Sequence, residues 1–273
     1  MFKYKLISVD LDGTLLDSQK HVSEENRAAI RTFTEGGGYL VPNTGRSFFE
    51  MPEEIRELPG VRYFICSDGS DIYDKETGTH ISLGMTREEA NAVYREIAEY
   101  ETFIMLHYSD NTYVDLDRTD DETMAHHGMD AFFRAQAHAC PHVADFDTFC
   151  KTREDTGMIC IFFADLEKRK ACREKLLGMG YCVVSTASHN LEVFSRKAGK
   201  GNAITALANH LGIPKEQLIA AGDGENDVTM FEAVGLALAT ANGRDFVKEA
   251  ADAVICTNDE HIIPYIMEKY VNP

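Results

Sequence analysis

Two carboxylates follow the first apolar run of the chain. Asp10 and Asp12 come directly after residues 6–9, which we expect to form a buried strand. Side chains two residues apart on an extended chain point the same way, so both carboxylates can face one site. Gly13 permits a sharp turn there, and Thr14 can hydrogen-bond back into the turn. The pair suits metal binding or proton transfer, although an ordinary polar turn at a strand end has the same residues.

Three further polar segments lie where predicted strands end or where a helix begins. They are Thr44-Gly45-Arg46 after strand 39–41, Lys200 before Gly201 after strand 191–194, and Gly222-Asp223-Gly224-Glu225-Asn226-Asp227 after strand 218–221. Ligand sites of open parallel sheets lie just beyond the carboxyl ends of the strands. We therefore expect these segments to converge with Asp10 and Asp12.

Together with Asp10-Leu11-Asp12-Gly13-Thr14, these segments resemble the haloacid dehalogenase superfamily, and within it the Cof-type phosphatases. Their order and separations match over essentially the whole chain. The first and last motifs are a highly specific pair, whereas the second and third would be weak alone. The resemblance implies a Mg²⁺-dependent phosphomonoester hydrolase.

The chemistry of a phosphate ester gives each acid a role. Asp10 would attack phosphorus and become an aspartyl-phosphate, while Asp12 would protonate the departing alkoxide and then take a proton from water. An anionic nucleophile is repelled by an anionic ester, and Mg²⁺ held by Asp10, Asp223 and the backbone carbonyl of Asp12 would remove that obstacle. Asp227 lies one helical turn after Asp223 and would orient metal-bound waters or Lys200.

Phosphoryl transfer also needs groups that position and neutralise the phosphate. The expected groups are Thr44, Lys200, Asn226, Arg46 and the backbone amides of Leu11 and Gly45. Lys200 would offset the charge of the phosphate and of Asp10. Arg46 meets the substrate or pairs with a surface acid. In isolation Thr44 would be interpreted as a helix N-cap and Lys200 as an exposed charge.

The composition limits the classes of partner. The chain has 273 residues and a formal net charge of -18, which argues against nucleic-acid and anionic-membrane surfaces. Seven cysteines without a C-x-x-C spacing indicate free thiols in a reducing compartment. We see no leader and no apolar stretch near the ~20 residues that a membrane span needs. We expect a cytoplasmic monomer or weak homodimer that binds a small phosphorylated metabolite.

The elements that must position these residues alternate as strand and helix. This alternation predicts an α/β protein with a doubly wound, parallel-sheet, Rossmann-like core formed by residues 1–83 and 191–273. Residues 84–190 carry their own strands and helices, including a capping box at Thr86 and Glu89. The place of this insertion resembles the α/β (C2B-like) cap of Cof-type phosphatases. Such a cap closes over the site and selects the leaving group.

Some residues depart from the family pattern or attract other interpretations. Asp68-Gly69 stands where relatives usually carry Asn-Gly, and Thr240-Ala241-Asn242-Gly243 replaces the usual Met-Gly-Asn-Ala. His107, His126, His127, His138 and Arg134 of the insertion are interpreted as solvated or packed side chains. His189-Asn190, at the expected return to the core, is the better candidate for a substrate contact.

We expect hydrolysis of a small soluble phosphate, sugar phosphates first. One alternative is a phosphomutase or phosphotransferase that uses the same intermediate. Another is a non-catalytic regulatory protein that binds a phosphometabolite, against which the intact set of Asp10, Asp12, Lys200 and Asp223 argues.

Overall fold

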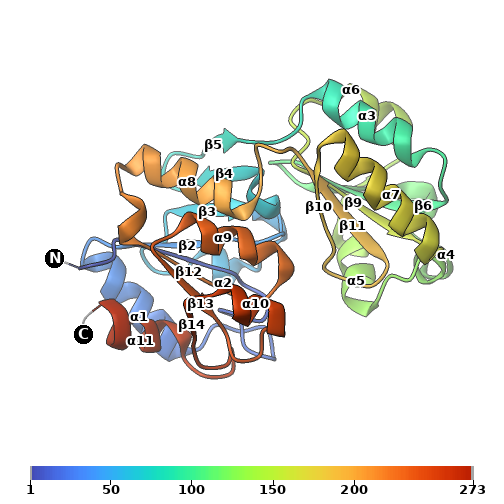
Figure 1. Cartoon of the computed structure of the whole chain (residues 1–273). Helices are drawn as coiled ribbons and strands as arrows, with labels where there is room; N and C mark the ends of the chain where they lie inside the picture. The colour runs from blue at the N-terminus through green and yellow to red at the C-terminus, as the bar shows by residue number, and fades with distance from the viewer. Residues whose placement is uncertain (1, 272–273) are drawn as a thin grey trace. The chain divides into compact units, whose positions relative to one another are not determined.

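The computed structural model describes residues 2–271 and separates them into two compact units (Figure 1). The core unit contains residues 2–46, 51–81 and 199–271, and the inserted unit contains residues 47–50 and 82–198. The insertion therefore ends eight residues later than the expected residue 190. It also includes the four residues that follow Arg46.

The core unit is built on a parallel five-stranded sheet in the order β14-β13-β12-β1-β2. All four residues of β1 are fully buried, as a strand covered on both faces requires. Helix α8 packs on α9, and α1 packs on α11 across the opposite face of the sheet (Figure 1). The predicted doubly wound α/β core is confirmed.

The strands of this sheet are β1 (Leu6–Val9), β2 (Tyr39–Pro42), β12 (Leu218–Gly222), β13 (Leu236–Ala239) and β14 (Ala253–Val254). The helices of the core unit are α1 (Glu24–Glu35), α2 (Glu53–Arg56), α8 (Lys200–Leu211), α9 (Val228–Ala233), α10 (Asp245–Ala250) and α11 (Ile262–Ile266).

The third strand of the chain departs from the predicted parallel alternation. β3 (Tyr63–Cys66) pairs antiparallel with β4 (Asp71–Asp74) in a separate sheet that β5 (Thr79–Ser82) completes. Three consecutive residues between β3 and β4, Ser67 to Gly69, have positive φ angles of 48°, 51° and 86°. This left-handed run reverses the chain at once, so no crossover helix follows β3. A single parallel bridge between Asn43 and Ile65 links β3 to the end of β2.

The helix expected over residues 48–58 is also wrong as a continuous element. The structure has a 3₁₀ turn at Phe48–Glu50 and then the short helix α2. Pro52 lies between them, lacks an N–H to donate, and disfavours helical geometry at the residue before it.

The inserted unit has a six-stranded sheet in the order β10-β11-β9-β6-β7-β8. Its central strand β9 is buried at every residue because alternate side chains enter two hydrophobic clusters. Ile159, Ile161 and Phe163 belong to one cluster, and Cys160 and Phe162 belong to the other. The strands are β6 (Thr102–His107), β7 (Thr112–Asp115), β8 (His142–Val143), β9 (Met158–Phe163), β10 (Cys182–Val184) and β11 (Asn190–Phe194).

Helices of the inserted unit begin at polar caps. Thr86 accepts from the Glu89 amide at 3.2 Å and the Glu89 carboxylate accepts from the Thr86 amide at 2.8 Å, so the predicted capping box is confirmed. The helices are α3 (Arg87–Ile97), α4 (Asp121–His126), α5 (Ala131–Ala139), α6 (Phe146–Thr152) and α7 (Leu166–Met179). Strand β11, which the sequence pattern assigns to the core, pairs with β9 and β10 of this unit.

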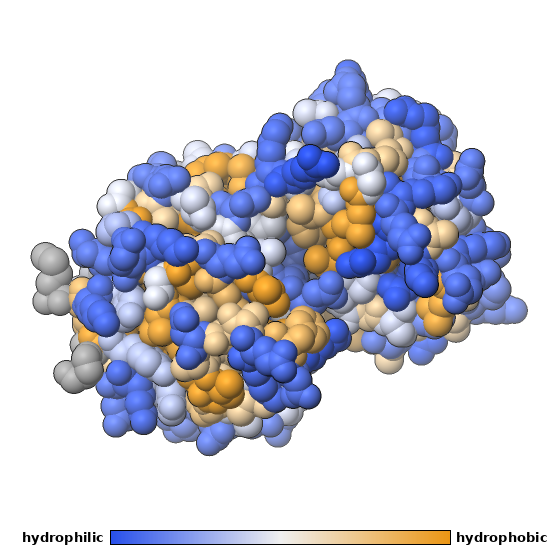
Figure 2. All heavy atoms as spheres, viewed as in Figure 1, coloured by the Kyte–Doolittle hydropathy of each residue, from blue (hydrophilic) through white to orange (hydrophobic). Residues whose placement is uncertain are grey.

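Hydrophilic residues cover much of the face seen in Figure 2, with hydrophobic patches between them on both units. Among residues 2–271, no helix is both long enough and apolar enough to cross a bilayer.

Candidate active site

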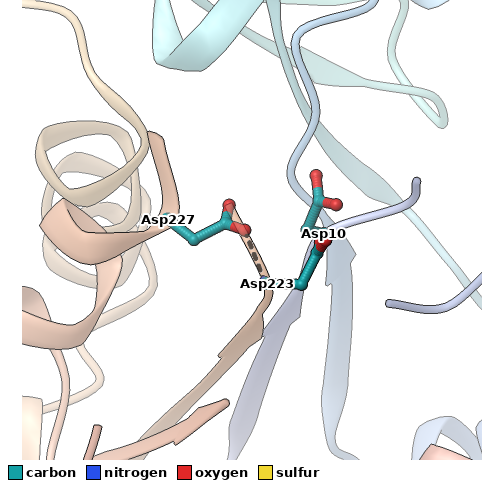
Figure 3. A group of neighbouring side chains, drawn as sticks. All are labelled: Asp10, Asp223 and Asp227. Atoms are coloured by element: carbon teal, nitrogen blue, oxygen red, sulfur yellow. Dashed lines mark hydrogen bonds between the residues drawn. The ribbon is translucent and has the colours of Figure 1, made fainter. Parts of the chain in front are cut away.

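Two adjacent strands of the core sheet bring the first and last motifs together. β1 and β12 are parallel neighbours in which Val9 pairs with Ala221, and the Asp10 amide donates to the Ala221 carbonyl at 3.0 Å. Asp10 and Asp223 therefore lie beyond the same edge of the sheet (Figure 3). One carboxylate oxygen of each, together with one of Asp227, lies within 4.8 Å of the others. The expected convergence of the first and last motifs is confirmed.

Lys200 joins two of these acids. Its ammonium Nζ donates to Asp10 Oδ1 and to Asp227 Oδ1, both at 2.7 Å, and its side chain has no exposed surface. Lys200 is the first residue of α8, and the next residue is Gly201. A Cβ on Gly201 would lie 2.0 Å from the Thr229 carbonyl oxygen of α9. Gly201 therefore lets α8 approach α9 closely, and this approach sets the position of Lys200.

The second oxygen of Asp227 holds the loop that carries Asp223. Asp227 Oδ2 accepts from the Asp223 and Gly224 amides, each at 2.9 Å (Figure 3). Thr14 in turn donates its hydroxyl to Asp223 Oδ1 at 3.1 Å. Asp227 thus contacts both the lysine and the main chain of the loop.

The acids outnumber the cation in this cluster. Burial raises the pKa of Asp10 well above its ordinary value, against the opposing attraction of Lys200. Burial and the charge of Asp227 raise the pKa of Asp223 to about 6. Both shifts mean that the ionised carboxylates lack enough positive charge nearby. A set of clustered carboxylate oxygens in this state fits a hard divalent cation such as Mg²⁺.

Asp12 has different surroundings from Asp10. Its carboxylate accepts from Arg46 Nε at 2.9 Å and Nη2 at 2.8 Å, and from Lys20 Nζ at 2.8 Å. Although burial raises the pKa of Asp12, Arg46 and Lys20 lower it below its ordinary value. The partner of Arg46 is therefore the expected acid–base residue itself, and Lys20 is a contact that sequence reasoning missed. A lysine eight residues after Asp12 gave no pattern that would have identified it.

Two backbone amides at this edge remain available to a ligand. Within residues 2–271, the N–H groups of Leu11 and Gly45 donate to no acceptor. Thr44, the neighbour of Gly45, is buried, and its Oγ1 accepts from the Arg46 amide at 3.2 Å, which leaves its hydroxyl proton free to donate elsewhere. Free amides and a hydroxyl after two neighbouring strands, β1 and β2, suit an anion.

Two departures from the family pattern take part in the site. The Asn242 amide nitrogen donates to the Gly13 carbonyl at 2.8 Å, so the Thr240-Ala241-Asn242-Gly243 segment anchors the first turn. Asp68 Oδ1 accepts from Asn226 Nδ2 at 2.9 Å, and Asp68 is fully buried. The acid expected near an entrance is thus packed against the last motif.

The four singled-out histidines of the inserted unit have partners within that unit. His107 lies 3.4 Å from Glu50, His126 3.1 Å from Glu101, and His138 3.1 Å from Asp121. His127 Nδ1 donates to the Thr123 carbonyl at 2.7 Å.

His189-Asn190 does not lie at the return to the core, because the inserted unit continues to residue 198. Asn190 is fully buried, and its Oδ1 accepts from the Thr186 and Ala187 amides to hold a turn.

Comparisons with known proteins agree with this geometry. The haloacid dehalogenase-like hydrolase family matches residues 7–267. The chain is 32% identical to the phosphatase YwpJ of Bacillus subtilis strain 168, over 97% of this chain and 99% of that protein. It is 26% identical to the 5-amino-6-(5-phospho-D-ribitylamino)uracil phosphatase YwtE of the same strain, over 98% of each.

A solved haloacid dehalogenase-like hydrolase from B. subtilis superimposes with a TM-score of 0.81 at 30% identity, and covers 97% of this chain and 99% of its own. The chain belongs to the haloacid dehalogenase-like hydrolases, and within them it is a Cof-type phosphatase.

Proposed function

We propose that this phosphatase hydrolyses a small phosphate monoester through an aspartyl-phosphate on Asp10, with Mg²⁺ as cofactor. One observation carries the proposal: a buried lysine bridges Asp10 and Asp227 at 2.7 Å, while Asp223 completes a group of carboxylates within 4.8 Å. Such an arrangement supplies a nucleophile, a positive charge beside it, and oxygen ligands for a cation.

Each residue of the cluster then has a task. Asp10 attacks phosphorus, and Lys200 reduces the repulsion between that carboxylate and the phosphate. When bound by Asp10, Asp223 and the Asp12 carbonyl, Mg²⁺ supplies charge neutralisation. Asp227 keeps Lys200 and the Asp223 loop in place through its two oxygens.

The free amides of Leu11 and Gly45, with the Thr44 hydroxyl, hold the phosphoryl oxygens. Phosphoryl transfer depends mostly on positioning and charge stabilisation, which these groups can provide. Asn226 adds an amide donor from the last motif.

Asp12 protonates the leaving alkoxide and later deprotonates the water that cleaves the intermediate. Its pairing with Arg46 and Lys20 favours the ionised form, which is the form that the water step uses. The earlier step needs a protonated Asp12. We therefore expect these two ion pairs to loosen when a phosphate competes for Arg46 and Lys20.

Sugar or polyol phosphates are the substrates that we place first, with the inserted unit acting as the selective cap. The name of one relative contains a phosphorylated ribityl chain, and that protein is similar over 98% of this chain.

The test measures phosphate release from p-nitrophenyl phosphate with Mg²⁺ and with excess EDTA. Wild type should be active only with the metal, and Asp10→Asn should lose the activity. Asp245→Asn is the matched control, because its carboxylate is exposed on α10. Equal rates for wild type and Asp10→Asn would reject the catalytic assignment. Transfer of phosphate to an added polyol in preference to water would favour a phosphotransferase.

A further inference from the structure

Asp68 combines three features that stability alone does not explain. Its side chain is fully buried, one carboxylate oxygen lacks any hydrogen-bond partner within residues 2–271, and its φ of 51° is left-handed. An unpaired buried oxygen and a left-handed residue other than glycine each destabilise a fold. An asparagine here would suit the backbone and avoid burying a charge. The charge of Lys200 attracts this carboxylate and offsets part of the cost, but it does not supply a hydrogen bond to the second oxygen.

The main chain fixes where this carboxylate lies. The Asp68 amide donates to the Thr44 carbonyl at 3.1 Å, and the Asp68 carbonyl accepts from the Gly199 amide at 3.0 Å. The residue is thus held between the loop of the second motif and the start of α8. A Cβ built on Gly45 would lie 3.5 Å from Asp68 Oδ2, so the carboxylate lies against the loop that offers the free Gly45 amide.

The partner of this carboxylate is Asn226, which is partly exposed. A carboxylate at Asp68 only accepts hydrogen bonds, whereas an asparagine there could accept or donate. Asp68 therefore admits one orientation of the Asn226 amide, with the nitrogen toward the Asp68 carboxylate, which itself lies against Gly45. The Asn226 oxygen points back over its own loop, 2.9 Å from where a Cβ on Gly224 would lie.

We propose that Asp68 is a positioning residue that turns the Asn226 amide so that its second N–H meets a phosphoryl oxygen of the substrate. This inference rests on the proposed function, because it places the phosphate beside Gly45. Asp68 itself need not touch the substrate.

Because Asp68 carries a charge, one substitution can distinguish orientation of Asn226 from simple charge repulsion. Removing a carboxylate near a phosphate site should tighten phosphate binding if charge repulsion were its only effect. If Asp68 acts by orienting Asn226, Asp68→Asn should instead weaken phosphate binding, because the amide then takes both orientations. The two accounts predict opposite signs for one substitution.

The experiment compares wild type, Asp68→Asn, Asn226→Ala and the double variant. It measures kcat and KM for p-nitrophenyl phosphate, the inhibition constant of inorganic phosphate, and the thermal unfolding midpoint. We expect Asn226→Ala to raise KM and the phosphate inhibition constant about tenfold, the loss of one hydrogen bond to an anion. Asp68→Asn should raise both several-fold, with a smaller change in kcat. In the Asn226→Ala background, Asp68→Asn should cause no further weakening.

Asp155→Asn is the matched control, because Asp155 is also left-handed but is exposed in the inserted unit. Tighter phosphate binding in Asp68→Asn, or losses that simply add in the double variant, would overturn the inference. A fall in unfolding midpoint with unchanged KM and inhibition constant would do the same. Failure of the proposed function is a separate result: wild type would not hydrolyse p-nitrophenyl phosphate with Mg²⁺, or Asp10→Asn would hydrolyse it equally well.

Discussion

Asp10 and Asp12 are two residues apart but have opposite electrostatic surroundings. Asp10 is buried beside a single lysine and other acids, whereas Asp12 is half-buried between Arg46 and Lys20. Such a difference can assign one carboxylate to nucleophilic attack and its neighbour to proton transfer. The sequence spacing alone shows that both acids face one site and does not distinguish their surroundings.

Substitution of Asp12 should separate the two chemical steps. p-Nitrophenolate leaves without a proton, so Asp12→Asn should still form the aspartyl-phosphate. Hydrolysis of the aspartyl-phosphate in this variant lacks a base and should slow by about 10²–10⁴-fold. Rapid mixing should therefore show a burst of p-nitrophenol of about one equivalent per enzyme, followed by slow turnover. Asp10→Asn, which has no nucleophile, should show no burst. If Asp12→Asn turns over as fast as wild type, Asp12 is not the base.

The first turn depends on Gly13 for two reasons, its backbone conformation and its closeness to Asp223. Gly13 has a φ of +86°, and a Cβ there would lie 2.5 Å from Asp223 Oδ2. Gly37 has a φ of +85°, but a Cβ there would meet nothing within 4 Å. An alanine would have a strained backbone at either position, but its Cβ would clash only at position 13.

Gly13→Ala should therefore lower kcat/KM by about 10²-fold or more, because displacement of Asp223 by an ångström misplaces the site. Gly37→Ala should lose about 1 kcal/mol of unfolding free energy and keep its activity. Steady-state kinetics and denaturant unfolding of both variants provide the check. Similar activity losses in the two would show that strain, and not the contact with Asp223, is responsible.

The inserted unit contains a buried glutamate, Glu50, that gives its stability a pH dependence. Glu50 accepts from the Ser47 amide at 2.7 Å and from Gln136 Nε2 at 3.0 Å, and lies 3.4 Å from His107 Nδ1. Although burial raises the pKa of Glu50, the charge and hydrogen bond of His107, together with hydrogen bonds from Ser47 and Thr112, lower it to about 2. The folded state thus binds fewer protons than the unfolded state between about pH 4.5 and pH 2.

Glu50 should therefore stabilise the fold fully above about pH 4.5 and lose that contribution as the pH falls to about 2. The shift corresponds to about 3 kcal/mol. Denaturant unfolding from pH 7 to pH 2 should show Glu50→Gln less stable than wild type at neutral pH, with the difference shrinking through this window. Glu122→Gln, on the exposed face of α4, is the control. A difference that stays constant with pH would contradict the assignment.

Sequence patterns predicted the elements that depend on residues close together in the chain. Ser23 and Thr86 cap their helices as expected, because an N-cap depends on residues three positions apart. β3 lies at the predicted residues, but its antiparallel pairing with β4 was not predicted. That pairing depends on the left-handed turn at Ser67 to Gly69, and the residue types of Ser67 and Asp68 do not by themselves predict a positive φ. The meeting of Asp10 and Asp223 was predicted because both follow strands of one parallel sheet. Lys200 joins them from the first residue of α8, and the strand before it in the chain, β11, belongs to the other sheet. The Lys20 and Asp68 contacts arise from chain folding that no spacing encodes.

The chain has a net charge of -18, and the acids that produce it lie in two kinds of surroundings. Most acids are exposed and screened by salt, but Asp10, Asp223 and Asp227 share one buried cluster with a single lysine. Folding must therefore bring these carboxylates together against their mutual repulsion. A cation that binds only the folded cluster should relieve that cost and stabilise the protein.

Mg²⁺ should accordingly raise the unfolding midpoint of the wild type. At a free concentration of about 100 times the dissociation constant, the linkage amounts to about 2.7 kcal/mol, which corresponds to about 5–10 °C for a chain of this size. Calorimetry with Mg²⁺ and with EDTA measures the shift. Asp223→Asn should remove most of it, because that variant has lost a ligand, while Asp245→Asn on exposed α10 should keep it. Since the non-specific effect of a divalent ion on an acidic surface would act on all three proteins alike, an equal shift in Asp223→Asn would place the bound cation elsewhere.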